Sequence, residues 1–269
     1  LTPFEYKYGI YSHESGKVVT WENRDNRYFP AYELASDQGI VMTDEYFHYP
    51  VGNWKAAGVA IPVFSLRSEH GAGVGEFTDI KPMVDWSVKT GMKIVQILPV
   101  NDTVATHTWV DSYPYAAISV HALHPIYAYL DAIGSLKDSK KQKEITQKAQ
   151  VLNGLKEVDY EGVMSLKTQF FKLSYDENKS TFLKSKDFKA FFEENKSWLE
   201  PYACFSFLRD KNGSPDFSSW GEYADGNLAK LSVLADPESA DYDDIAIHYY
   251  IQYYLDKLRR EASDDARKK

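Results

Sequence analysis

The sequence predicts an α/β protein with parallel strands, preceded by a short all-β segment. Three observations support this fold class. Side chains in the first thirty residues alternate between apolar and polar at a period of two, as in strands. Two apolar runs, residues 58–64 and 94–98, flank a segment with helical spacing and so form one βαβ unit. Most of the remaining chain has helical periodicity, and two strands are fewer than a sheet covered on both faces normally contains.

Composition excludes several classes of function. The 269 residues carry a net charge of −8 with no basic block before the last helix, which disfavours nucleic acid binding. No run approaches the roughly 18 apolar residues of a membrane helix, and no signal peptide opens the chain. Cys204 is the one cysteine, so no disulfide can form within the chain. Aromatic residues reach 15%, which fits either a large core or a surface that binds carbohydrate through flat rings.

The first elements are expected to be strands. Residues 4–11 alternate at period two, the stretch around Gly16 has turn chemistry, and residues 17–21 form a second strand, so we predict a hairpin. Trp21 at its end should be partly exposed. A two-stranded hairpin cannot bury a core by itself, so it belongs to something larger. Residues 31–54 have weak periodicity and are predicted to be a connector.

The βαβ unit occupies the next forty residues. Residues 58–64 are continuously apolar, as expected of a strand covered on both faces. A helix should begin after Asp79, which can cap it, and should end before Gly91, which suits the position after a helix. The second apolar run follows at once, so the two strands should be parallel with a right-handed crossover.

The remainder is expected to be helical. Residues 131–236 are predicted to be a helical insertion, with a solvated segment near 135–150 and several short amphipathic helices over 163–211. The clearest helix lies in 237–269, where apolar side chains recur at helical spacing: Ile247, Tyr250, Ile251, Tyr254, Leu255 and Leu258.

Three familiar motifs are incomplete. The glycines of residues 71–75 follow the first strand, but the dinucleotide-binding fingerprint G-x-G-x-x-G needs its third glycine at position 76, where this chain has Glu76. A mobile loop is therefore the preferred interpretation. His121 and His124 have no third metal ligand at a recognisable spacing, and hydrogen-bonding or core roles are favoured. Ser112 lacks the context of a nucleophile elbow. We therefore expect neither a cofactor nor a metal ion.

The loop over residues 99–115 is the strongest candidate for a binding site. It begins at the carboxyl end of a predicted strand, where α/β proteins place their ligands. Its side chains combine hydroxyl, amide and carboxylate groups with flat rings, a mixture that suits a sugar, although an ordinary surface loop is the alternative. They are Asn101, Asp102, Thr103, Asp111 and Ser112, with Trp109, Tyr113 and Tyr115.

At these residues the chain resembles the amylomaltases, which are 4-α-glucanotransferases or disproportionating enzymes. The resemblance covers residues 55–269 and lies in GVAIPVFSLR (58–67), GVGEF (73–77), QILP (96–99) and DSYPY (111–115) through His124-Pro125. It is closest to the subgroup with N-terminal starch-binding modules, known from plant cytosol and some bacteria. Residues 4–27, FEYKYGIYSHESGKVVTWENRDNR, resemble the last third of such a module.

The resemblance implies an incomplete (β/α)8 barrel of the TIM-barrel type. Residues 1–30 would be the remnant of the starch-binding β-sandwich, 31–54 the connector, 55–130 the first βαβ part of the barrel, 131–236 the helical insertion and 237–269 a helix leading back toward the barrel. The family transfers α-1,4-glucan segments by a retaining double displacement. Its two catalytic acids would lie on later strands, outside this sequence, so no catalytic residue is assigned and the chain alone is expected to be inactive.

The resemblance also implies binding residues. Ser112 and Tyr115 would contact the glucan near the cleavage point, Tyr113 is an inserted neighbour and Asp111 would order the loop. The starch-binding residues would be Lys7, Trp21, Glu22 and Asn26. The expected partner is an α-1,4-glucan or maltodextrin, the expected location is cytoplasmic, and the oligomeric state is not predicted. The alternatives are a non-catalytic starch- or glucan-binding protein and an α/β interaction domain.

Overall fold

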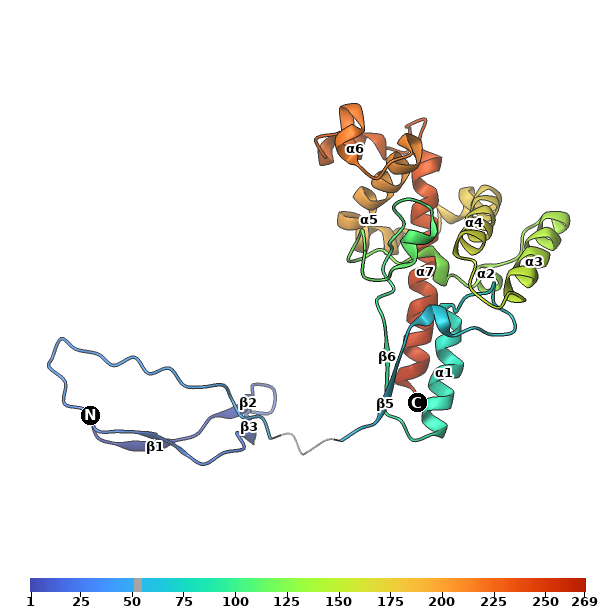
Figure 1. The fold of residues 1–269 in the computed structure, drawn as a ribbon. Coiled ribbons are helices and arrows are strands. Elements are labelled where there is room, and N and C mark those ends of the chain that lie inside the picture. The colour runs from blue at the N-terminus through green and yellow to red at the C-terminus, as the bar shows by residue number, and fades with distance from the viewer. Residues whose placement is uncertain (51–54) are drawn as a thin grey trace. The chain divides into compact units, whose positions relative to one another are not determined.

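The computed structural model describes residues 1–50 and 55–269, and the chain divides into two compact units, Leu1–Ala56 and Ala57–Lys269 (Figure 1). The last four residues of the connector predicted over 31–54 lie outside the described residues. Within the described ranges, no helix is both long enough and apolar enough to span a membrane. Each unit is treated below by itself.

The first unit is built from two short antiparallel pairs. Strand β2 (Gly9–Ser12) pairs with β3 (Lys17–Trp21), as the turn chemistry predicts. Strand β1 (Phe4–Tyr6) pairs instead with β4 (Arg27–Phe29). The predicted single hairpin of 4–11 with 17–21 is therefore correct for its second half and wrong for its first half.

A buried ion pair explains the extra pairing in this unit. Arg27, in β4, donates two hydrogen bonds to the carboxylate of Glu22, at 2.9 and 2.7 Å, and both side chains are almost inaccessible. Asp44 joins from the following segment, accepting from Tyr6 and Tyr8 through their hydroxyls at 2.8 and 2.6 Å. These polar contacts, more than apolar burial, hold the strands together, because few apolar side chains of this unit are buried.

The second unit begins with the predicted βαβ motif. Strand β5 (Gly58–Ile61) and strand β6 (Ile94–Ile97) are parallel, in register from Gly58 beside Ile94 to Ile61 beside Ile97. Helix α1 (Ile80–Lys89) lies between them in the chain and ends just before Gly91, whose φ is +76°. The parallel arrangement is confirmed.

The strands are less covered than the sequence suggests. Alternate residues of both strands are exposed, and Ile94 retains 43% of its accessible surface. The expectation that these apolar runs are covered on both faces is wrong for this structure. The half-buried side chains, such as Ile97, are those that pack against the core.

Helices make up most of the second unit. They are α2 (Leu130–Ile133), α3 (Ser139–Asn153), α4 (Tyr160–Phe182), α5 (Lys186–Asn212), α6 (Leu228–Leu234) and α7 (Tyr242–Arg267). Short 3-10 turns lie at Val63–Ser65, Phe77–Asp79, Trp109–Ser112, Pro125–Tyr127, Phe217–Ser219 and Gly221–Tyr223. Where several short helices were expected over 163–211, the structure has two long ones.

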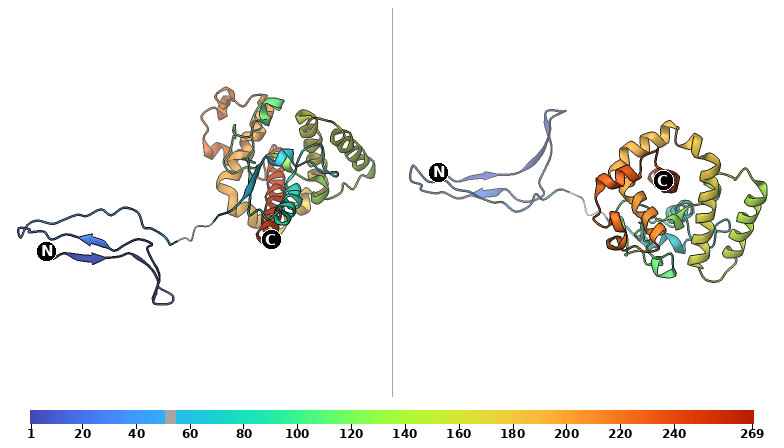
Figure 2. Two further views of the ribbon diagram at one scale, coloured as in Figure 1. Left: turned by 60° about the horizontal axis from the view of Figure 1, so that its bottom comes forward. Right: turned by 90° about the horizontal axis from the view of Figure 1, so that it is seen from above.

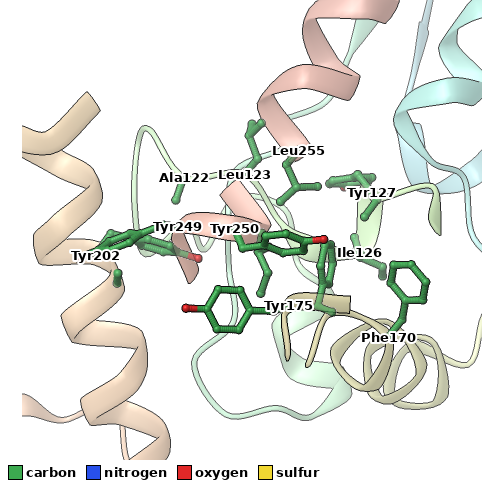
Figure 3. Close-up of a cluster of buried hydrophobic side chains, with 14 of the residues drawn as sticks. Ala122, Leu123, Ile126, Tyr127, Phe170, Tyr175, Tyr202, Tyr249, Tyr250 and Leu255 are labelled. Carbon is green, nitrogen blue, oxygen red and sulfur yellow. The ribbon is translucent and has the colours of Figure 1, made fainter. Parts of the chain in front are cut away.

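Helix α7 is the centre of this unit. It packs against α5, α4 and α1, and Figure 2 shows it with α4 and α5 beside it. Its predicted apolar stripe is buried at Tyr250, Ile251, Leu255 and Leu258. Figure 3 shows Tyr249 and Tyr250 of α7 in a core rich in tyrosine, with Phe170 and Tyr175 of α4 and Tyr202 of α5. Tyr175 and Tyr250, for example, pack with ring centres 5.6 Å apart. The high aromatic content therefore goes largely into this core.

Candidate functional site

A cavity of about 550 Å³ opens at the carboxyl ends of β5 and β6. Phe64 and Val74 line it from the segment after β5, and Asn101 and Thr103 line it from the segment after β6. The other lining residues come from the loop and the helical insertion: Trp109, Ser112, Pro114, His124, Ile126, Tyr127, Val158, Asp159, Tyr160 and Glu161. A cavity at this edge of parallel strands is where such folds bind ligands.

The loop after β6 is fixed from within by Asp111. This side chain is buried, and its carboxylate accepts from the backbone N of Thr106 at 2.9 Å and of His107 at 2.7 Å. It also accepts from the Thr106 hydroxyl at 2.9 Å. Three donors on one carboxylate close the turn tightly. Asp111 therefore orders the loop, and its carboxylate is engaged within the protein.

A second buried carboxylate, Asp102, ties the loop to helix α5. Its Oδ2 accepts from the Tyr202 hydroxyl at 2.6 Å, and its Oδ1 accepts from the backbone N of Val104 at 3.1 Å. Burial raises the pKa of Asp102 to about 6, against the effect of these donors. Helix α7 holds the segment around Leu123 through the side-chain amide of Gln252. Its Oε1 accepts from the backbone N of Leu123, and its Nε2 donates to the backbone O of Leu123, both at 2.8 Å.

Ser112 and Pro114 line the cavity, whereas the two neighbouring tyrosines do not. Tyr113 and Tyr115 are not among the residues that line the cavity, and they keep 61% and 60% of their surface exposed. Their ring centres lie 5.6 Å apart at an angle of 50°. Flat, exposed rings can stack on an apolar sugar face.

His124 is a structural hydrogen-bonding residue. Its Nδ1 accepts from the backbone N of Ile126 at 3.1 Å, which leaves the proton on Nε2 to donate to the Tyr160 hydroxyl 3.0 Å away. Burial lowers the pKa of His124 to about 3, so the ring is neutral at ordinary pH. His121 stacks on Trp198 with ring centres 5.5 Å apart. Among the described residues, no cluster of ligands suits a metal ion.

The glycine segment after β5 is buried and contributes Val74 to the lining of the site. Residues 71–77 are all buried, and a Cβ on Gly75 would lie 1.8 Å from the carbonyl O of Val63. The interpretation as a mobile loop is therefore wrong, because the glycines here allow close backbone packing. Within this segment Glu76 accepts from Lys167 at 2.5 Å, and Lys167 also donates to the carbonyl oxygens of Ile126 and Ala128.

The helical insertion contributes a wall that the sequence did not predict. Asp159 and Glu161, at the start of α4, line the cavity. Asp159 caps the helix by accepting from the backbone N of Gly162 at 2.9 Å, and Glu161 accepts from the backbone N of Trp109 at 3.0 Å. Because both carboxylates already hold backbone groups, we do not assign them as a catalytic pair. In the sequence, the one signal that could have identified this wall is Asp159, an N-cap residue type directly before a helical run.

The residues proposed for starch binding in the first unit have different surroundings. Trp21 is 54% exposed, as expected, and part of its ring lies over Gly9. Lys7 is half-buried, and the Asn26 amide donates to Glu5 at 3.0 Å on the surface. Glu22 is buried in its ion pair with Arg27, so its carboxylate does not face solvent. The assignment of Glu22 as a glucan contact is therefore not supported by its position.

Comparison with known proteins identifies the family. The family model described as 4-alpha-glucanotransferase matches residues 61–269. This chain belongs to the 4-alpha-glucanotransferase family. The 4-alpha-glucanotransferase DPE2 of Oryza sativa subsp. japonica is 43% identical over 216 residues, which are 80% of this chain and 23% of the rice protein. The 4-alpha-glucanotransferase of Chlamydia trachomatis is 38% identical over 198 residues, 73% of this chain and 36% of its own length.

Solved amylomaltases share the fold of this family member. The amylomaltase from Streptococcus agalactiae, solved in complex with acarbose, matches with a TM-score of 0.60 at 21% identity, covering 80% of this chain and 41% of that one. The amylomaltase from Corynebacterium glutamicum matches with a TM-score of 0.57 at 15% identity, covering 79% and 28%. The chain thus spans between about a quarter and two fifths of the lengths of these proteins.

Proposed function

We propose that this chain forms one wall of the glucan-binding cleft of a 4-α-glucanotransferase. The observation that carries the proposal is the cavity at the carboxyl ends of β5 and β6, into which Ser112 and Pro114 face. Its polar groups, including the Asn101 amide and the Ser112 hydroxyl, can pair with sugar hydroxyls. Its apolar side chains, including Trp109, can cover the C–H faces of the ring.

In this proposal Ser112 and Tyr115 contact the α-1,4-glucan near the bond that is cleaved. The transferred segment would pass through a glucosyl-enzyme to a sugar acceptor with retention of configuration. Neither carboxylate that lines the cavity from α4 is assigned to this chemistry, so the chain is expected to bind and orient substrate. The barrel architecture, with β5 and β6 as its first two strands, and a cytoplasmic location are parts of the same proposal.

Disproportionation of maltotriose tests the proposal. The full-length protein should convert maltotriose into glucose and longer maltodextrins, resolved by anion-exchange chromatography. The 269-residue chain in the same assay should give none above background. Longer products from the 269-residue chain would contradict the assignment of substrate binding without catalysis.

A non-catalytic glucan-binding role is the second candidate, because Trp21, Tyr113 and Tyr115 are all exposed rings. Pull-down of the full-length protein on insoluble starch separates it from the first candidate when combined with the transfer assay. Binding without transfer would favour this role. Tyr28→Ala is the control, because Tyr28 is an exposed aromatic residue on β4. Loss of starch binding in Trp21→Ala but not in Tyr28→Ala would assign the starch-binding surface to the first unit.

A further inference from the structure

His107 has an unusual backbone conformation in the loop before Asp111. Across residues 1–50 and 55–269, it is the one non-glycine residue with positive φ, at 59°. A side chain in this left-handed region costs free energy, because Cβ approaches the following carbonyl oxygen. Such a conformation persists where surrounding contacts fix it. The contacts of His107 therefore indicate what the turn is held against.

Helix α5 fixes this turn at two points. His107 Nε2 lies 2.7 Å from Oδ1 of Asp210, which is 103 positions further along the chain. The same Oδ1 accepts from Nε of Arg209 at 2.7 Å, and Nη1 of Arg209 donates to the carbonyl O of Val104 at 2.6 Å. Adjacent residues of α5 thus hold the beginning of the turn through its backbone and its end through the imidazole.

The charges around His107 favour this contact. Burial opposes ionisation of Asp210, but hydrogen bonds from His107 and Arg209 lower its pKa to about 2, so the carboxylate is charged. His248 of α7 also faces the group, and burial lowers its pKa to about 4, so it is neutral near pH 7. Asp111, on the loop itself, receives the backbone N of His107 at 2.7 Å.

We propose that His107 is a positioning residue of the glucan cleft, which it serves by clasping the turn at residues 104–107 to Asp210. Asp111, held by the backbone of this turn, directly precedes Ser112, which faces the cavity. His107 does not line the cavity, so it acts through Asp111 and not on the sugar. This inference rests on the proposed function, since it assigns a role within the same cleft.

Four variants of the full-length protein test the clasp. His107→Gly removes the imidazole while allowing positive φ, so it separates the clasp from backbone strain. His107→Gln keeps an N–H donor that can reach Asp210. Asp210→Asn removes the charge of the carboxylate. The double variant His107→Gly with Asp210→Asn completes a double-mutant cycle. Asp241→Asn is the matched control, because Asp241 forms a similar exposed pair with Lys211 of α5 at 3.1 Å and neither partner belongs to the loop over residues 99–115.

With maltotriose as substrate, His107→Gly and Asp210→Asn should each lower kcat/KM by about tenfold, mostly in kcat, because a displaced wall fits the transition state poorly. The double variant should be no worse than the poorer single variant, since both remove one contact. The kcat/KM of His107→Gln should be within about threefold of the wild-type value. The kcat/KM of Asp241→Asn should equal the wild-type value. Amide exchange at residues 106–112 should accelerate in His107→Gly.

Two kinetic results would each overturn the clasp: kcat/KM of His107→Gly within twofold of the wild type, or losses that multiply in the double variant. Unchanged amide exchange at residues 106–112 in His107→Gly would also overturn it, with or without transfer activity. If the wild type itself transfers no glucan, the proposed function fails, and with it the role in the cleft, whereas accelerated exchange would then show a clasp that serves another purpose.

Discussion

Lys167 donates to Glu76 over 2.5 Å, and both side chains are almost completely buried. Glu76 belongs to the buried glycine segment after β5, and Lys167 belongs to α4 in the helical insertion. The ammonium group also holds the carbonyl oxygen of Ala128 at 2.8 Å. One buried charge pair thus joins the strand-loop part of the second unit to its insertion.

Lys167→Ala should lower the free energy of unfolding by about 3–5 kcal/mol, because it leaves a carboxylate buried without its partner. The double variant Lys167→Met with Glu76→Leu should recover much of this loss, since a neutral pair of similar volume avoids the desolvation penalty. Urea unfolding followed by far-UV circular dichroism measures both. An Ala variant as stable as the wild type would mean that the pair contributes little.

The first unit should lose structure in acid. The hydrogen bonds from Arg27 lower the pKa of Glu22 to about 2 from its ordinary value of 4.5. A depressed folded pKa means that this contribution is present above about 4.5 and is lost as pH falls toward 2. Backbone NMR signals of residues 27–29 should therefore broaden or shift over this range. In Glu22→Gln they should already be perturbed at pH 6 and should change little below it.

Gly75→Ala should destabilise the second unit by about 3 kcal/mol or more, since the added carbon meets rigid backbone and not a side-chain tip. Its Cβ would lie 1.8 Å from the Val63 oxygen and 2.7 Å from the Leu66 nitrogen. Gly154→Ala is the control: its backbone is helical and its nearest contact would be 3.4 Å. Thermal unfolding should show a large fall in the free energy of unfolding for Gly75→Ala and a change within about 1 kcal/mol for Gly154→Ala.

Tyr115→Ala should lower kcat/KM for maltotriose by about ten- to hundredfold in the full-length protein, or roughly 1.4–2.8 kcal/mol. The ring of Pro114 fixes its own φ and restricts the backbone of Tyr113, so the segment that leads into Tyr115 is ordered before substrate arrives. Tyr115→Phe should cost much less if stacking dominates and nearly as much if the hydroxyl is the contact.

Tyr113→Ala provides the comparison for Tyr115, because its ring is equally exposed and lies 5.6 Å from that of Tyr115. Unchanged kinetics in Tyr115→Ala with an intact fold would show that the ring is not a substrate contact. An equal loss in both variants would indicate that the two rings act as one surface.

Local patterns predicted the local elements. The βαβ unit and the last helix follow from side-chain spacing over ten to twenty residues, and both are present. The pairing of β1 with β4 depends on the ion pair between Glu22 and Arg27, which no periodicity reveals. The exposure of β5 and β6 could not be predicted either, since an apolar run indicates that a strand can be covered but not what covers it.

The site was predictable on one side only. The loop at residues 99–115 could be chosen because its polar and aromatic mixture follows a strand. The opposite wall, which includes Asp159 and Glu161, lies about fifty positions away in the chain and carries no motif. The structural roles of Asp111 and Glu22 depend on hydrogen-bond partners that only the folded chain defines.

The bond from Gln252 to Leu123 has a consequence for synthesis on the ribosome. The loop after β6 obtains this support, and the bond from Tyr202 to Asp102, from residues 129 and 100 positions later in the chain. At about 5–20 residues per second, roughly 6–26 s pass between translation of Leu123 and translation of Gln252. During that interval the loop and the two parallel strands lack their helical supports and are exposed to chaperones and to aggregation. Folding of the loop after β6 is therefore tied to completion of α7.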